Sequence, residues 1–327
     1  MVRFGIIGFG AHAEKRYLPA FARVEEAALI AIQKRDREAV RQKQEEHGIP
    51  LGFTDPGELA ACNEVDAVIV ASPPGLHREH TLMAAAAGKH VLVEKPMAAC
   101  AAECEEMIAA CDRREVLLMV GFSMRFLEST RRMRELLQAG RIGRLRYVHM
   151  GFTVDGALSP RSWLWDPRLS GGGPVADLGA HLLDLIRFVG RESVEEVTGF
   201  VEPQFTGEQV ERQAAVSLKL HSGALAQLFV SFELPRNKFM HFVGTEGQLY
   251  TSDFSEPGTQ VSLTLCREGR KEEWEVGNGD PFARMVREFA EAIEHRTLPP
   301  VPGEEGLITQ RLIDGIYRVK TRFNQNG

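Results

Sequence analysis

The feature that most constrains this fold lies at the start of the chain, where an apolar run is followed at once by a glycine-rich turn. Residues 2–7 predict a buried strand, and the turn that follows runs Gly-Phe-Gly-Ala-His-Ala from Gly8 to Ala13. Residues 11–23 can then form a helix. Strand, tight turn and helix in this order are typical of the G-x-G-x-x-G/A fingerprint of dinucleotide-binding proteins, with Ala13 in the third glycine position.

Each small residue of this turn has a physical role. Gly8 permits the tight turn, Gly10 lets the backbone approach a pyrophosphate, and Ala13 lets the helix pack closely on the strand. The N-terminus of the helix offers unpaired N–H groups and the positive end of its dipole to phosphates. We therefore expect this turn to contact the cofactor through Gly8, Phe9, Gly10, Ala11 and His12.

Length and composition bound the remaining possibilities. With 327 residues, the chain is long enough for two domains, and its 44% hydrophobic and 26% charged residues are typical of a soluble globular protein. Its net charge of −6 argues against nucleic acid or an anionic membrane as a general partner. The first strand begins too early for a signal peptide, and no apolar run approaches the roughly 20 residues of a membrane helix. Five scattered cysteines fit a reducing compartment, so we expect a cytoplasmic protein.

Residues 1–124 alternate between the strand and helix patterns. Strands are predicted at 2–7, 28–33, 66–71, 90–94 and 117–122, and helices at about 11–23, 36–47, 76–87 and 99–113. Because the strands are continuous apolar runs, both faces of their sheet should be covered by helices. The pattern predicts an α/β domain with a doubly wound parallel sheet, a Rossmann fold, whose ligand crevice lies beyond the carboxyl ends of its strands.

The end of the second strand bears on the choice between NADP and NAD. An NAD enzyme places an acidic residue here to hold the ribose 2′-OH, whereas this chain has Lys34 and Arg35 at the aligned position. Two cations can receive the 2′-phosphate of NADP, so NADP(H) is favoured. NAD stays possible, because Asp36 follows directly and could take the ribose role if both cations are merely solvated.

The segment after the third strand, Ser72-Pro-Pro-Gly-Leu-His77, can lie along the dinucleotide. We expect Ser72, Pro73 and His77 to contact the cofactor. His77 and His80 have the i, i+3 spacing that could serve a metal, but no carboxylate or cysteine partner is evident nearby. Helix packing or a cofactor-side contact is the preferred interpretation, and we expect no metal.

The fourth strand ends in Glu94-Lys95-Pro96. A lysine at the carboxyl end of a strand in this crevice would point toward the nicotinamide. Its ammonium group can bind a substrate hydroxyl and stabilise the charge that develops on the oxygen as hydride leaves. The alternative is a surface lysine paired with Glu94. Both residues are candidate cofactor contacts, and Lys95 is a candidate catalytic residue.

Beyond residue 124 the pattern changes, so residues 125–327 are expected to form a second, α+β domain for substrate binding and oligomerisation. Strands are predicted at 145–154, 194–202, 214–220, 225–232, 239–243, 249–252 and 261–266, and closing helices at 281–295 and 304–323. Several strands alternate apolar and polar residues, which indicates a mostly antiparallel open sheet with one covered face. The other face is a natural surface for a homodimer or homotetramer.

A helix starting near Val175 would place Asp177, His181 and Asp184 on one face, because they are spaced i, i+4, i+7. A polar stripe on an otherwise apolar helix must face either water or a pocket. The alternative is a core histidine whose hydrogen bonds are satisfied by the two aspartates.

Three motifs stand in order along the chain: the Gly-Phe-Gly-Ala-His-Ala turn, the run Ala-Gly-Lys-His-Val-Leu-Val-Glu-Lys-Pro, and the run Gly-Gly-Gly-Pro-Val-Ala-Asp-Leu-Gly-Ala-His-Leu-Leu-Asp. Together they resemble the glucose–fructose oxidoreductase/inositol dehydrogenase/MocA (Gfo/Idh/MocA) family of NAD(P)-dependent dehydrogenases, over essentially the whole chain. The resemblance implies a pocket with Lys95 and His181 in opposite walls, and an oligomer formed through the second domain. At Pro74 the chain departs from the Pro-Asn that the family usually has.

The chemistry of alcohol oxidation then suggests a role for each residue. His181 is the best general base, or the acid in the reducing direction, and Lys95 orients and stabilises the oxygen. Asp177 holds a substrate hydroxyl or orients the histidine. Further candidates for binding a sugar-like small molecule are Arg125, Trp163 and Asp166, and Asp177 and His181 belong to the same group.

The preferred function is an NADP-dependent dehydrogenase or reductase of a sugar, polyol or cyclitol-like compound. Two alternatives stay open: a non-catalytic NADP(H)-sensing regulator of the same fold, and a glycoside hydrolase that uses tightly held NAD. Because Lys95, Asp177 and His181 are all present, catalysis is favoured over regulation.

Overall fold

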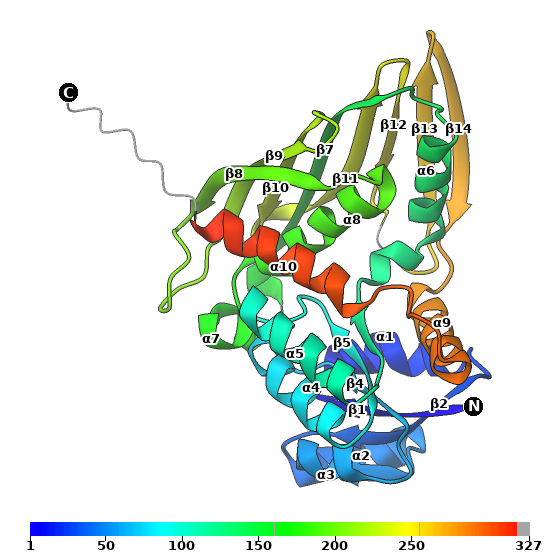
Figure 1. The fold of residues 1–327 in the computed structure, drawn as a ribbon, viewed down its shortest axis with the longest axis vertical. Helices are drawn as coiled ribbons and strands as arrows, with labels where there is room; N and C mark the ends of the chain where they lie inside the picture. Colours follow the sequence, from blue (N-terminus) through cyan, green and yellow to red (C-terminus); the bar gives the residue numbers. More distant parts are fainter. Residues whose placement is uncertain (160, 255, 319–327) are drawn as a thin grey trace, which may run out of the picture.

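The structure, a computed structural model, describes residues 1–159, 161–254 and 256–318. It contains two sheets, one above the other in Figure 1, with helices between and around them. The lower sheet has six strands in the order β3-β2-β1-β4-β5-β6, and all its pairs are parallel. The upper sheet has eight strands in the order β14-β13-β12-β11-β7-β10-β9-β8.

The lower sheet confirms the predicted Rossmann fold. Its strands are β1 (Val2–Ile7), β2 (Ala27–Gln33), β3 (Leu51–Phe53), β4 (Ala67–Val70), β5 (His90–Glu94) and β6 (Leu118–Gly121). Its helices are α1 (Ala11–Phe21), α2 (Arg37–His47), α3 (Pro56–Ala61), α4 (His77–Ala86) and α5 (Ala101–Arg113). Every residue of β4 and β6 is buried, as expected for a sheet covered on both faces. The strand order reverses between β1 and β4, which places the ligand crevice at their carboxyl ends.

One strand of this sheet and one of its flanking helices were not predicted. Strand β3 is only three residues long, too short to show a period, and it pairs in parallel with β2 at the edge. Helix α3 is a six-residue helix that starts at Pro56, and the Asp55 side chain caps it by accepting from Glu58 N. Both lie in a polar stretch that resembles a loop.

The upper sheet is formed by β7 (Leu145–Asp155), β8 (Val194–Glu202), β9 (Gln213–Leu220), β10 (Leu225–Ser231), β11 (Glu233–Gly244), β12 (Gly247–Ser252), β13 (Gln260–Arg267) and β14 (Arg270–Gly277). Its pairs are antiparallel except for β7 and β10, which are parallel. Strand β14 was not predicted, because five of its first six residues are charged and it lies at the exposed edge of the sheet.

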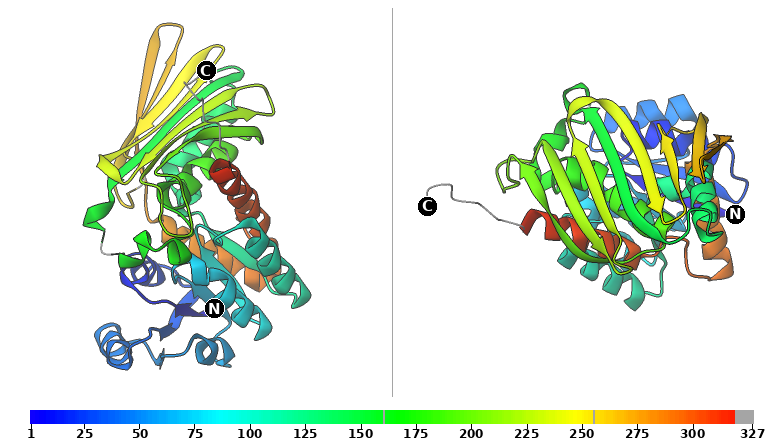
Figure 2. Two further views of the ribbon diagram at one scale, coloured as in Figure 1. Left: turned by 90° about the vertical axis from the view of Figure 1, so that its left-hand side faces the viewer. Right: turned by 90° about the horizontal axis from the view of Figure 1, so that it is seen from above.

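Helices cover one face of the upper sheet. They are α6 (Glu128–Gln138), which was not predicted, α8 (Ala180–Gly190) and α10 (Gly303–Arg318). The predicted residues 319–323 of the last helix lie outside the described part of the chain. The opposite face carries no helix among the described residues, and Figure 2 shows it turned to the viewer in the view from above. The expected open sheet with one covered face is therefore present.

The last part of the chain returns to the lower sheet. Helix α9 (Pro281–His295) packs on α1, and α10 lies between α5 of the lower layer and β8 of the upper sheet. Val120 N on β6 donates to Val301 O, and Met119 forms a bridge with Pro302. A boundary at residue 124 therefore separates the two sheets, but not the helices that close the chain.

Short helical turns connect these elements near the carboxyl ends of the lower strands. They are η1 (Pro74–Leu76), η2 (Ser123–Phe126), η3 (Gly156–Leu158), η4 (Ser162–Trp165), α7 (Pro167–Ser170) and the π-helical η5 (Val175–Gly179). Among the described helices, none combines the length and the apolar character that crossing a bilayer requires.

Candidate active site

The glycine turn after β1 has the geometry that a bound diphosphate needs. Gly8 has φ +79°, and a Cβ there would lie 2.6 Å from Ser72 N, so only glycine fits. At Gly10 the nearest atom to an added Cβ is 3.9 Å away, which leaves the backbone open to a ligand. Gly10 is the N-cap of α1 and makes no side-chain capping bond, so the first N–H groups of the helix can bind phosphate oxygens.

The end of β2 places its two cations beside this turn. Lys34 Nζ donates to Phe9 O at 2.8 Å, and the Arg35 side chain is exposed. Asp36 is used elsewhere, because its carboxylate caps α2 by accepting from Ala39 N at 2.7 Å. The residues present therefore fit a dinucleotide, and the two cations suit a 2′-phosphate better than the capping aspartate suits a ribose hydroxyl.

The two histidines after β4 are held by their own surroundings. Both ring nitrogens of His77 lie near carbonyl oxygens, Nε2 at 2.7 Å from Ser72 O and Nδ1 at 3.0 Å from Pro96 O. His80 Nδ1 lies 2.9 Å from Ser72 Oγ. Both imidazoles therefore link the loop Ser72–His77 to its neighbours, and neither points at a shared ligand position.

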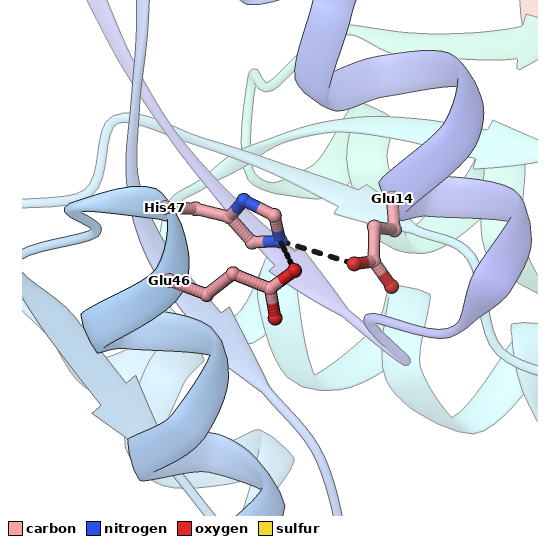
Figure 3. Close-up of side chains that lie close together, drawn as sticks. All are labelled: Glu14, Glu46 and His47. Atoms are coloured by element: carbon pink, nitrogen blue, oxygen red, sulfur yellow. Dashed lines mark hydrogen bonds and ion pairs between the residues drawn. The ribbon is translucent and has the colours of Figure 1, made fainter.

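Within the described residues, one histidine and acid group is compact enough for a metal: Glu14, Glu46 and His47, shown in Figure 3. His47 Nε2 lies 3.0 Å from Glu14 Oε1. Lys43 Nζ donates to Glu14 at 2.6 Å and to Glu46 at 2.8 Å. Because an ammonium group already bridges both carboxylates, this group is an ion-pair network that joins α1 to α2.

Glu94, the last residue of β5, contacts His12 and Lys95, two residues that line a cleft between the two halves of the chain. Its carboxylate accepts hydrogen bonds from Tyr17 Oη at 2.6 Å and Lys95 N at 3.1 Å, and lies 3.1 Å from His12 Nε2. Burial alone would raise the pKa of Glu94, but His12, Tyr17 and the Lys95 charge outweigh it and lower the pKa to about 2. The Glu94 carboxylate is therefore ionised at neutral pH, and it holds the backbone N–H of Lys95.

Lys95 and Asp177 form an ion pair between the two halves of the chain. Lys95 Nζ donates to Asp177 Oδ1 at 2.7 Å and to the Asp177 carbonyl at 2.9 Å. Arg161 approaches the same carboxylate with two N–H groups, at 3.1 Å and 2.7 Å. Although burial opposes ionisation, Arg161 and Lys95 hold the pKa of Asp177 well below its usual range. Asp177 is thus a fixed anion that positions the Lys95 ammonium.

His181 lies in the same cleft with few constraints on its imidazole. Its ring stacks on Phe152 with centroids 6.5 Å apart and planes 29° apart. Its Nδ1 is buried and has no hydrogen-bond partner among the described residues. Burial, and then the nearby Lys95 charge, lower the pKa of His181 well below its usual value. The imidazole is therefore neutral at pH 7.

Of the expected polar stripe, Asp177 and His181 line the same cleft, whereas Asp184 does not. Residues Val175–Gly179 are π-helical, which changes the angular spacing before α8 begins. Asp184 binds Arg125, whose Nε donates to both Asp184 carboxylate oxygens at 3.0 Å and 2.8 Å. Asp177 instead accepts from Lys95. Neither carboxylate hydrogen-bonds His181 in the described structure, so the core-histidine interpretation is not supported.

Three residues expected to bind substrate are not among those that line the cleft. Arg125 is buried between Asp184 and Glu305, with Arg187 on the same glutamate, and this network joins α8 to α10. Its Nε and Nη2 both bind carboxylates inside the protein, which argues against the substrate role. Trp163 supports Arg161, whose guanidinium lies 5.3 Å from its ring centroid. Asp166 caps α7 and pairs with Arg168 at 3.0 Å.

The cleft itself has a volume of about 270 Å³, and residues from both halves of the chain line it, among them Arg16 of α1 and Phe152 of β7. Its charged and histidine lining residues are His12, Arg16, Lys95, Arg161, Asp177, His181, Arg236, Lys238 and Glu256. Sequence reasoning missed Arg16, Arg161, Arg236, Lys238 and Glu256. The sequence gives a signal for two of these residues: Arg236 and Lys238 alternate directly before the strand predicted at 239–243.

Two models of known protein families match this chain. The family profile described as "Oxidoreductase family, NAD-binding Rossmann fold" matches residues 2–122, and the GFO/IDH/MocA C-terminal domain matches residues 130–250. The chain belongs to the Gfo/Idh/MocA family of oxidoreductases. The resemblance inferred from its three motifs is thereby confirmed, as are the Rossmann domain and the second α+β domain.

Individual members of the Gfo/Idh/MocA family match over almost the whole chain. D-xylose 1-dehydrogenase (NADP(+)) 2 of Haloferax volcanii is 32% identical over 320 residues, which cover 96% of this chain and 96% of that protein. An aldose-aldose oxidoreductase from Caulobacter crescentus, solved with glycerol, superposes with a TM-score of 0.90 at 28% identity, covering 97% of this chain and 96% of that one. A 3-ketoreductase from Actinomadura kijaniata, solved with NADP and TDP-benzene, has a TM-score of 0.86 at 26% identity, and 96% of each chain is covered.

Proposed function

We propose that this protein transfers hydride between a nicotinamide dinucleotide, preferentially NADP(H), and a CH–OH or carbonyl carbon of a sugar, polyol or cyclitol-like substrate. One observation carries the proposal: Lys95 and His181, from different halves of the chain, line one cleft with His12 of the open glycine turn. The relatives named above, a xylose dehydrogenase, an aldose-aldose oxidoreductase and a 3-ketoreductase, support hydride transfer to or from such a compound.

The residues of this chain can hold a dinucleotide as follows. Gly8–His12 and the first turn of α1 would bind the diphosphate, and Lys34 and Arg35 the 2′-phosphate. Ser72, Pro73 and His77 form the neighbouring loop after β4. When bound, the nicotinamide supplies the hydride acceptor or donor, and the side chains in the cleft handle the proton.

In the oxidising direction, His181 accepts the proton of the substrate hydroxyl, because its depressed pKa keeps the imidazole neutral. The Lys95 ammonium donates a hydrogen bond to the same oxygen and stabilises its developing charge. Asp177 keeps the ammonium in place through a hydrogen bond of 2.7 Å. In the reducing direction the same imidazole returns the proton.

Turnover by purified protein tests this proposal. NADP⁺ or NADPH is offered with a panel of sugars, inositols, keto-sugars and sugar acids, and the NADPH absorbance is followed. We expect turnover with at least one compound. Lys95→Met should lower kcat about 10²–10³-fold and His181→Asn about 10²–10⁴-fold, since each removes a group that acts in the transition state. Lys271→Met and His221→Asn, on the upper sheet away from the cleft, are the matched controls and should leave kcat unchanged.

Other results would favour the alternatives. NADPH binding without turnover across the panel indicates a regulator. Cofactor that stays bound through purification, with glycoside cleavage but no net change in NADPH, indicates a hydrolase. Full turnover by Lys95→Met would remove the proposed site.

We also propose that the protein is a homodimer or homotetramer formed through the open face of the upper sheet. Exposed apolar side chains on these strands support this, among them Phe200 (77% exposed), Leu225 (55%) and Tyr250 (41%).

A further inference from the structure

The cleft that holds Lys95 and His181 has an excess of positive charge. Five cationic side chains line it: Arg16, Lys95, Arg161, Arg236 and Lys238. Only two carboxylates line it, Asp177 and Glu256. A neutral sugar offers no charge to balance this excess, so the charges bear directly on what the cleft binds.

The charges fall into two groups. In the inner group, Asp177 pairs with Lys95 and Arg161, as described above. The outer group consists of Arg16, Arg236 and Lys238, and all three share Glu256. Arg16 lies 3.5 Å from this carboxylate, Lys238 lies 3.7 Å from it, and Arg236 donates to it directly. Three cations therefore converge on this one carboxylate.

Lys238 is the most buried of these three cations. Its side chain is 4% exposed, and its Nζ lies 4.3 Å from the ring centroid of Phe152. Burial, and then repulsion by Arg236, lower the pKa of Lys238 to about 8, although Glu256 and the nearby Asp253 oppose this. Asp253 does not line the cleft. An anion bound here would relieve the repulsion.

The outer group is well placed to hold a distant part of the substrate. Arg236 and Lys238 are two residues apart on β11, and both side chains line the cleft. Lys238 is paired in register with Phe152 of β7. Phe152 in turn stacks on His181. Arg16 approaches from α1, on the other side of the cleft, and packs near Phe282. The reacting carbon and an anionic substituent could therefore be bound in one cleft.

We propose that Arg16, Arg236 and Lys238 bind an anionic substituent of the substrate, a carboxylate or a phosphate, so that the enzyme acts on an acidic or phosphorylated sugar-like compound. This rests on the function proposed above and specifies its substrate class. The cofactor phosphates are assigned elsewhere, at Gly8–His12 and at Lys34 and Arg35. Charge-assisted hydrogen bonds from the two guanidinium groups suit either anion.

Binding, measured by titration calorimetry on the full-length enzyme saturated with NADPH, tests this without requiring turnover. The probes are matched sets: D-glucose with D-gluconate and D-glucose 6-phosphate, D-xylose with D-xylonate, and D-galactose with D-galacturonate. In at least one set the anion should bind about tenfold or more tightly than its neutral sugar, and added salt should weaken this preference. Comparing carboxylates with the phosphate identifies which anion the site takes.

Variants connect the preference to the outer group. Arg236→Gln and Lys238→Gln should each reduce the affinity for the preferred anion about tenfold or more, with little change for the neutral sugar or for NADPH. Arg270→Gln, an exposed arginine at the start of β14, is the charge-matched control and should change none of these affinities. Circular dichroism confirms that each variant is folded.

Three outcomes would overturn the inference. The anion binds no more tightly than its neutral sugar in any set, the variants lose affinity equally for the anion and the neutral sugar, or the variants lose affinity only for NADPH. The last would assign these cations to the cofactor. Tight anion binding without any redox turnover would instead count against the proposed function and leave the anion site intact.

Discussion

At the scale of single residues, the state of His181 decides how the cleft can work. A histidine on the surface has a pKa of about 6.5 and is partly protonated at neutral pH. Here burial and the adjacent Lys95 charge lower the pKa well below that value, so the base needs no further deprotonation. The buried, unpartnered Nδ1 also indicates a polar group whose partner arrives with a ligand.

The pH dependence of oxidation follows from this depressed pKa. A general base acts only when it is deprotonated, so kcat/KM should stay level as the pH falls through about 6.5 and decline only at lower pH. The measurement is kcat/KM against pH, in buffers of constant ionic strength. A decline centred near the ordinary histidine value would contradict the assignment of His181. Lys95→Met should move the decline to higher pH, because it removes a charge that disfavours the imidazolium ion.

The functional roles of some of these residues could be predicted from the sequence, and those of others could not. Lys95 follows an unmistakable buried strand, and His181 lies in a glycine-bounded helical run, so both could be proposed from pattern and resemblance. Arg161 lies in a loop without any pattern, and its partner Asp177 is 16 residues away. Arg125 was misassigned because a buried arginine and an exposed one look the same in sequence. Its partners, Asp184 and Glu305, come together only in the fold.

At the scale of elements, we propose that the turn between β2 and α2 determines the choice between NADP and NAD. Lys34 and Arg35 follow the strand directly, and Asp36 is the N-cap of the helix. The double variant Lys34→Ala, Arg35→Ala should raise KM for NADP⁺ about tenfold or more and leave KM for NAD⁺ nearly unchanged, because NAD⁺ lacks the 2′-phosphate. Steady-state kinetics with both cofactors provides the measurement.

Asp36→Ala is the informative companion variant. Loss of the cap should destabilise the protein by about 1 kcal/mol, seen as a lower unfolding midpoint, while the preference for NADP⁺ is kept. If this variant instead loses only its NAD⁺ activity, Asp36 holds the ribose and the two cations are solvated. An unchanged preference in the double variant would also contradict the assignment.

Most elements were predicted because the period of the sequence agrees with the fold. The closing helix α9 was placed at 281–295, where its apolar stripe packs on α1 and η2. The exceptions have physical reasons. A π-helical segment breaks the 3.6-residue spacing at Val175–Gly179, and the parallel pairing of β7 with β10 is a long-range contact that hairpin signals do not predict. Edge strand β14 is charged because exposed edges favour charge.

At the scale of the whole molecule, the upper sheet presents one face that no helix of the described residues covers. Besides the exposed apolar side chains, this face carries aromatic contacts such as His149 with Phe239, whose ring centroids are 4.9 Å apart. A second copy of the chain could cover this surface. The oligomer expected from the sequence can therefore be tested at particular positions.

Leu225→Glu combined with Tyr250→Glu should shift the protein from a dimer or tetramer to a monomer in size-exclusion chromatography with light scattering. Both side chains are exposed in the single chain, so the fold should be kept, whereas two buried charges would destabilise an interface. Leu298→Glu is the control, since Leu298 is 76% exposed but lies between α9 and α10. A monomeric parent, or an oligomer that survives the double change, would show that this face is not the interface.

The bridge between β6 and residues 301–302 has a consequence for how the protein is made. Strand β6 is complete once residue 121 has been translated, but Val301, which accepts the hydrogen bond from Val120, is synthesised near the end of the chain. On the ribosome, the nascent dinucleotide-binding layer therefore keeps one edge unpaired through more than half of translation. Polypeptides released early by a premature stop codon should be poorly soluble, even those that contain every strand of the first sheet.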